Sequence, residues 1–245
     1  MISSSVRCGV LQWLLNLSLQ LIYYKYSPEQ LEQKAEALLR QFDEERLTRI
    51  KPIDVYAVIE KCLDVPYDWK YLTPDQSILG MTAFKSGFLW VWPTPYYRDG
   101  ILPYKISVDA GTILIDGTLT EATNRGPENF TVMHEVFHQV LHKRCFAHSN
   151  PDYTHTSTKR ALESHMKPLS SLEICEYQAN ACAAAFLMPR NLVADRLKHY
   201  GVTYTLDFSR YKDREILSIL ADEFSVSKTA MKYRLIHLKH AVPDK

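Results

Sequence analysis

The sequence lacks an excess of charge of either sign, any CxxC pair, and any long uninterrupted apolar run. A formal net charge of +1 gives the molecule no general attraction to nucleic acid or to anionic lipid. Five cysteines, an odd number, indicate free thiols in a reducing compartment, so we expect a cytoplasmic protein. The 245 residues, 46% of them hydrophobic, suffice for the core of one large or two small domains.

An apolar segment occupies residues 1–26, but Gln12, Asn16 and Gln20 interrupt it. It is too short and too polar for a membrane span, and no A-x-A-like cleavage site follows Arg7. We therefore expect no membrane association. The segment is interpreted as a peripheral helix, or as an extension that arises from a start codon placed too early, and secretion or anchoring is the less favoured alternative.

The most informative stretch of the chain is His134-Glu135-Val136-Phe137-His138. Residues four apart lie on one face of a helix, so the two imidazoles can hold a single Zn²⁺ ion. The carboxylate of Glu135 then lies within reach of an attacking water and can act as a general base. The pattern predicts a zinc-dependent hydrolase.

The flanking residues favour a helix over residues 127–144. Pro127 suits the first helical position, where its missing N–H has no intrahelical acceptor. Apolar residues then recur at helical spacing, and Lys143 and Arg144 lie in the last turn, where cations interact favourably with the helix dipole. The alternative is a surface helix that carries two histidines and a glutamate without a metal.

A catalytic zinc site needs a third protein ligand. The metzincin pattern HExxHxxGxxH is excluded, because Leu141 replaces its glycine and Arg144 replaces its third histidine. His142 lies about 12 Å along the helix axis from His134, at 1.5 Å per residue, which is too far for one ion. We expect His142 to be a structural or helix-terminal histidine.

A second helix, predicted over residues 171–188, offers carboxylates instead. Ser171 is a candidate N-cap, alanine is abundant, and Pro189 ends the run. Glu176 can bind metal, and Asn180, four residues later, can hydrogen-bond the free ring nitrogen of a liganding histidine. Glu173 is the rival ligand. The alternative is an alanine-rich packing helix with a solvated acidic end.

Elsewhere in the chain, capping and hydrophobic patterns predict further helices and strands. Ser27 to Gln30 form a capping box before an amphipathic helix that continues to about residue 42, and a further helix covers residues 53–63. Strands are expected at 78–84, 88–92, 104–108 and 112–115. The turn residues 85–87 and 109–111 suggest hairpins. Residues 145–170 are expected to form a loop whose candidate oxyanion-stabilising side chains cannot be ranked: His148, Tyr153, His155 and His165.

The C-terminal segment predicts two further helices, about 215–224 and 228–240, joined by a turn with Ser227 as N-cap. The second carries Lys228, Lys232, Arg234 and Lys239 and no acid. Residues 204–245 nevertheless hold eight Lys or Arg against six Asp or Glu, which is weak for a DNA-binding segment. A scaffolding role is favoured over DNA binding through residues 213–240.

Four segments together resemble the ImmA/IrrE family of zinc metallopeptidases, over about residues 50–240. They are residues 78–84, 112–116, 129–142 and 176–189, and the run Glu176-x-x-Ala179-Asn180, followed by Ala-Ala and Leu-Met-Pro, is the most specific of them. The resemblance implies His134, His138 and Glu176 as zinc ligands and Glu135 as catalytic base. It also favours Glu176 over Glu173, and implies cleavage of a helix-turn-helix (Cro/CI-like) repressor.

The expected fold is α+β and zincin-like. It comprises a small twisted sheet, an active-site helix, a glutamate-bearing helix, N-terminal helices and a C-terminal segment similar to a helix-turn-helix. We divide the chain into an extension (1–26), a metallopeptidase domain (27–203) and a helical segment (204–245). The predicted function is a zinc-dependent endopeptidase that derepresses genes of a phage or mobile element. The alternative is a DNA-associated or antirepressor protein with structural zinc and no proteolysis.

Overall fold

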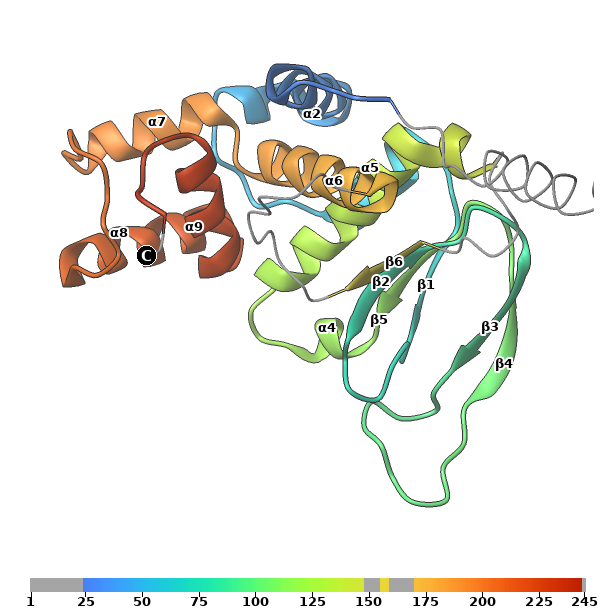
Figure 1. Ribbon diagram of the computed structural model, residues 1–245. Coiled ribbons are helices and arrows are strands. Elements are labelled where there is room, and N and C mark those ends of the chain that lie inside the picture. The colour runs from blue at the N-terminus through green and yellow to red at the C-terminus, as the bar shows by residue number, and fades with distance from the viewer. Residues whose placement is uncertain (1–23, 148–154, 159–169, 244–245) are drawn as a thin grey trace, which may run out of the picture.

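The computed structural model describes residues 24–147, 155–158 and 170–243, and the fold is α+β (Figure 1). The residue 1–26 extension thus lies almost wholly outside the described residues. Among the residues that are described, no helix combines the length and the apolarity needed to cross a bilayer. The helices are α2 (Pro28–Asp43), α3 (Val55–Val58), α4 (Thr118–Glu121), α5 (Gly126–Ala147), α6 (Ser171–Leu187), α7 (Arg190–His199), α8 (Tyr211–Glu223) and α9 (Lys228–His237).

Within the described residues, six strands form two small sheets. They are β1 (Tyr67–Lys70), β2 (Ile78–Thr82), β3 (Gly87–Val91), β4 (Tyr104–Val108), β5 (Ile113–Asp116) and β6 (His155–Thr158). The larger sheet has the order β1-β5-β2-β6, in which only β1 and β5 are parallel, and β3 pairs with β4 in a separate ribbon. The prediction of a loop throughout residues 145–170 is wrong at β6, because that strand pairs with β2.

Both expected hairpins are wrong. Strand β2 pairs with β5 and not with β3, and Ala83 continues that pairing through hydrogen bonds with Thr112 and Gly111. Beyond these residues the same two chain segments separate from the larger sheet and pair again as β3 and β4. The turn residues at 85–87 and 109–111 are therefore corners at which one long antiparallel ribbon bends from the first sheet into the second.

Helix α5 lies between the larger sheet and α6 (Figure 1). It contacts β2 and β5 on one side and α6 on another, and α6 in turn contacts α2. Small buried residues of α6, among them Ala179 and Ala183, allow α5 and α6 to approach closely, as their spacing predicts. This three-layer arrangement holds α5 inside the molecule and leaves its histidines beside α6.

The N-terminal helix begins as predicted. The Ser27 hydroxyl accepts a hydrogen bond from the backbone N–H of Gln30, whose side chain accepts one from the Ser27 N–H, which completes a capping box. The predicted 53–63 helix is a short α-helix, α3, that continues as a π-helical turn over Ile59–Leu63. Helix α2 packs against α6, whereas α3 contacts α5 and the π-helical turn contacts α2, and residues of all three join the main core.

The C-terminal pair of helices is confirmed, with Ser227 as the N-cap of α9. Its identity as a helix-turn-helix stays a prediction. The turn before α9 lies against the start of α5: the Asn129 amide donates to the carbonyl of Ser225, and a Cβ at Gly126 would come within 2.5 Å of the Val226 backbone. Only glycine permits this approach, so the turn packs tightly against the HExxH helix.

Candidate metal centre

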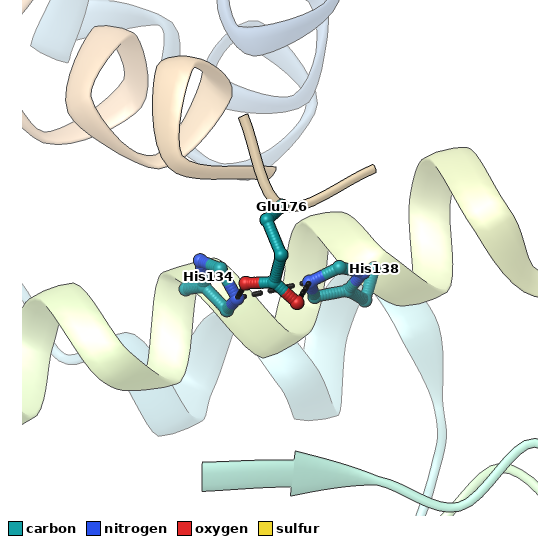
Figure 2. A group of neighbouring side chains, drawn as sticks. All are labelled: His134, His138 and Glu176. Carbon is teal, nitrogen blue, oxygen red and sulfur yellow. Dashed lines mark hydrogen bonds and ion pairs between the residues drawn. The ribbon is translucent and has the colours of Figure 1, made fainter. Parts of the chain in front are cut away.

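The two histidines of the HExxH stretch lie on one face of α5, one turn apart, and both are almost fully buried. Their Nε2 atoms are 2.9 Å apart. Figure 2 shows both rings turned toward the carboxylate of Glu176, which approaches from α6. The helical spacing of His134 and His138, which is local information, accounts for their placement on the same face of α5.

Glu176 reaches both rings at once. One of its carboxylate oxygens lies 3.3 Å from His134 Nε2, and the other lies 3.7 Å from His138 Nε2. Its side chain is 30% exposed, whereas the histidine side chains are 1% exposed or less, so the carboxylate marks the solvent side of the cluster. Residues from α5 and α6 therefore converge on one point.

The rival carboxylate has a different task. The N-cap of α6 is Ser170, one residue earlier than the expected Ser171. Glu173 accepts a hydrogen bond of 2.7 Å from the Ser170 backbone N–H and so completes a second capping box. Glu173 is therefore engaged at the helix end. Among the described residues, the donor atoms that lie within 4.8 Å of one another belong to His134, His138 and Glu176.

The donor set fits a zinc ion. Tetrahedral zinc with nitrogen ligands at about 2.0–2.1 Å spaces its donor atoms about 3.3 Å apart. The separations of 2.9, 3.3 and 3.7 Å bracket that value. Two bare ring nitrogens at 2.9 Å repel each other, so a proton or a cation between them is required, and a divalent cation satisfies both rings and the carboxylate together.

The outward-facing ring nitrogens are also occupied. His134 Nδ1 lies 2.9 Å from Asn180 Oδ1, which is the contact expected for that asparagine. His138 Nδ1 lies 3.0 Å from Nδ1 of His142. His142, expected to be a structural or helix-terminal histidine, is buried in the C-terminal part of α5 and contacts a histidine of the cluster. Its contact with His138 was not predicted from the sequence.

Glu135 points in another direction, toward strand β2. Its Oε2 accepts a hydrogen bond of 2.7 Å from the hydroxyl of Thr82, and both residues are fully buried. A Cβ at Gly80 would lie 2.8 Å from Glu135 Oε1, so only glycine leaves room for the carboxylate there. No role for Thr82 or Gly80 was predicted from the sequence. The available signal was an isolated glycine within a strand pattern, which often marks a close approach.

The charge state of the cluster follows from its burial and its partners. Burial disfavours the charged form of His134, but the hydrogen bond and negative charge of Glu176, with smaller contributions from Glu135 and Asn180, outweigh it and raise the pKa of His134. Burial also raises the pKa of the Cys175 thiol to about 12. Cys175 and Cys145 are buried in a small apolar group with Phe84 and Phe146, which agrees with packing rather than with a thiolate ligand.

The oxyanion candidates cannot be placed. His148, Tyr153 and His165 lie outside the described residues, and His155 begins β6, whose side chains are not described. Their proposed role stays a prediction.

Comparison with known proteins identifies the family. The model of a peptidase family, the IrrE N-terminal-like domain of peptidase family M78, matches residues 107–236. A search of curated proteins gave no match. The matched region is more than half of the 245 residues and contains α5, α6 and every residue of the donor cluster. The chain belongs to the M78 peptidase family, the family of IrrE N-terminal-like domains.

Proposed function

We propose that this protein is a zinc-dependent endopeptidase in which His134, His138 and Glu176 hold the ion and Glu135 is the general base. The observation that carries the proposal is the convergence of three donor groups from α5 and α6 next to a buried carboxylate that the same helix positions. Membership in a peptidase family supports hydrolysis of a protein substrate.

The roles of the side chains follow from their chemistry. When bound, the ion would act as a Lewis acid that polarises the scissile carbonyl and lowers the pKa of a water molecule toward neutrality. Glu135 takes a proton from the attacking water and returns it to the leaving amine. Because the Thr82 hydroxyl donates to Glu135 Oε2, it holds one carboxylate oxygen in place while the other exchanges the proton.

The proposed substrate is a helix-turn-helix repressor of the Cro/CI type, whose cleavage would switch on the genes of a phage or mobile element. Support for this substrate comes from the resemblance to the ImmA/IrrE family. The proposed cellular site is the cytoplasm, where such a repressor and the free thiols of this chain are both expected.

DNA binding by α9 is less well supported. Arg234, one of the three Lys or Arg residues of α9, is 2% exposed and forms an ion pair with Glu32 of α2. It is therefore not available to a phosphate group. The turn before α9 is covered by the start of α5. Both observations favour the scaffolding role for residues 213–240.

The proposal is tested with a repressor of the Cro/CI type encoded next to the gene for this protein. The zinc-loaded wild type should convert the repressor to two fragments, which mass spectrometry locates, while Glu135→Gln should retain zinc and leave the repressor intact. Cleavage by Glu135→Gln at the wild-type rate would refute the assigned base. An intact repressor that co-elutes with the wild type, or tight duplex-DNA binding with a steep salt dependence and no proteolysis, would favour the non-proteolytic alternatives.

A further inference from the structure

Three histidines stand in a row along α5. His134, His138 and His142 are spaced four residues apart, and the ring of His138 lies between the other two. His138 directs Nε2 toward His134 and Glu176, and Nδ1 toward His142 Nδ1 at 3.0 Å. The third ring continues the row to α6, where its Nε2 lies 3.0 Å from Gln178 Oε1.

Gln178, at the end of this row, determines which atom donates in each of its hydrogen bonds. The Gln178 side-chain amide donates through Nε2 to the backbone carbonyl of Tyr24 at 2.8 Å. A carbonyl can only accept, so Gln178 presents its amide nitrogen to Tyr24 and its amide oxygen to His142. Gln178 and His142 are each 1% exposed.

The position of each proton follows in turn. Gln178 Oε1 only accepts, so Nε2 of His142 must carry a proton. A neutral imidazole that is protonated at Nε2 has a bare Nδ1, which accepts a hydrogen bond from His138. His138 is then protonated at Nδ1, and its lone pair at Nε2 points toward His134 and Glu176, as a metal ligand requires.

We propose that His142, held by Gln178, is a positioning residue that locks His138 in its metal-binding tautomer. The inference rests on the proposed zinc centre. It assigns to α6 three tasks: Glu176 provides a ligand, Asn180 accepts from the ring of His134, and Gln178 acts on His138 through His142. Removal of such a hydrogen-bond partner typically lowers metal affinity about 10- to 100-fold.

Two variants of His142 separate this role from simple space filling. His142→Leu removes the acceptor and keeps an apolar side chain, whereas in His142→Gln an amide oxygen can accept from His138 Nδ1. We expect zinc affinity, measured by competition with a chromogenic chelator, to fall about 10- to 100-fold in His142→Leu and to recover substantially in His142→Gln. Equal affinities in wild type and His142→Leu would overturn the proposal.

A matched control lies on the same helix. Phe137 is fully buried, and its ring packs against that of Phe186 of α6. Phe137→Leu should therefore lower the melting temperature and leave zinc affinity within about twofold of wild type. If Phe137→Leu lowers zinc affinity as much as His142→Leu does, the effect is one of general packing and the proposal is wrong.

The tautomer of His142 can be measured without an activity assay and without bound metal. Two-bond ¹H–¹⁵N correlation spectra of ¹⁵N-histidine-labelled, metal-free protein should show His142 as the Nε2–H tautomer. Detection of the Nδ1–H tautomer would overturn the chain of hydrogen bonds. If the wild type shows the expected tautomer but binds no zinc, the proposed metal centre is refuted instead. If it binds zinc as proposed but cuts no repressor, only the proposed substrate is refuted.

Discussion

The hydroxyl of Thr82 lies 2.7 Å from Oε2 of Glu135, and neither side chain is accessible to solvent. This contact joins the inner strand β2 to the proposed catalytic helix, 53 residues away in the sequence. A hydrogen bond to a charged group contributes about 1.5–3 kcal/mol. The contact is therefore large enough to decide how the carboxylate is oriented.

Thr82→Val should lower kcat about tenfold or more, because it keeps the shape of the side chain and removes the donor. Zinc content should be unchanged, since the Thr82 hydroxyl donates to Glu135, which is not one of the three donor residues. Thr82→Ser is the matched control and should restore most of kcat. In the Glu135→Gln background, Thr82→Val should have little further effect, and additive losses would contradict the proposed contact.

Gly80→Ala tests the clearance around the same carboxylate. The added methyl group would lie 2.8 Å from both Glu135 Oε1 and the Thr131 side chain, so β2 or Glu135 must shift. We expect a loss of kcat at least as large as that of Thr82→Val, with a lower melting temperature. Gly87→Ala, where a Cβ meets nothing within 4 Å, is the control. A fully active Gly80→Ala enzyme would show that the tight approach is not needed.

Glu176→Ala and Glu173→Ala should separate metal binding from helix capping. After dialysis against a weak chelator, Glu176→Ala should lose its zinc, because one of three protein ligands is absent. Glu173→Ala should keep the metal and lose about 1 kcal/mol of stability through the broken capping box. Atomic absorption measures the metal and denaturant unfolding the stability. Equal metal loss in the two variants would remove Glu176 from the ligand set.

The buried ion pair of Glu32 and Arg234 should dominate the stability of the helical side. The Arg234 guanidinium donates to both oxygens of Glu32 and, through Nε, to the carbonyl of Met188 at 3.0 Å. Arg234→Leu should cost about 3–5 kcal/mol, because it leaves a buried carboxylate with only Arg190 beside it. The double variant Glu32→Leu/Arg234→Leu should be more stable than Arg234→Leu. Chemical denaturation checks both, and additive losses would contradict a direct coupling.

The same pair predicts how stability depends on pH. Burial raises the pKa of Glu32, but hydrogen bonding and the charges of Arg234 and Arg190 outweigh it, so the pKa lies below the ordinary value of 4.5. A lowered carboxylate pKa adds stability that is present above the unfolded-state pKa and is lost as pH falls through the folded-state value. The free energy of unfolding should therefore decline below about pH 4.5, and Glu32→Gln should show a shallower decline. Parallel pH profiles in the two proteins would contradict this assignment.

Local patterns predicted the helices and the positions of β2, β3, β4 and β5 well, and the pairing of the strands poorly. The extents of α5 and α6 and the caps at Ser27 and Ser227 follow from spacing and capping within a few residues. The pairing of β2 with β5 does not, because a turn at Lys85–Gly87 looks the same whether the chain reverses there or bends into another sheet. The pairing of strands is decided by contacts between residues distant in sequence, and local periodicity gives no information about those contacts.

The proposed site shows the same division. The face shared by His134 and His138 is a property of helical spacing, whereas the choice of Glu176 came from the family resemblance, because spacing alone left Glu173 open. The contacts of Thr82 with Glu135 and of Gln178 with His142 join different elements. Nothing in a single sequence reports them, since a buried threonine or glutamine is compatible with many partners.

The link from Glu32 to Arg234 also has a consequence for the order of assembly. The carboxylate is synthesised 202 residues before the guanidinium that neutralises it. Until α9 has emerged from the ribosome, α2 cannot place Glu32 in its final position without burying a charge that lacks its main counterion. The Met188 carbonyl, which ends the glutamate-bearing helix, receives its Arg234 donor at the same late step. The final packing of α2, the end of α6 and α9 against one another is thus expected only after translation has passed α9.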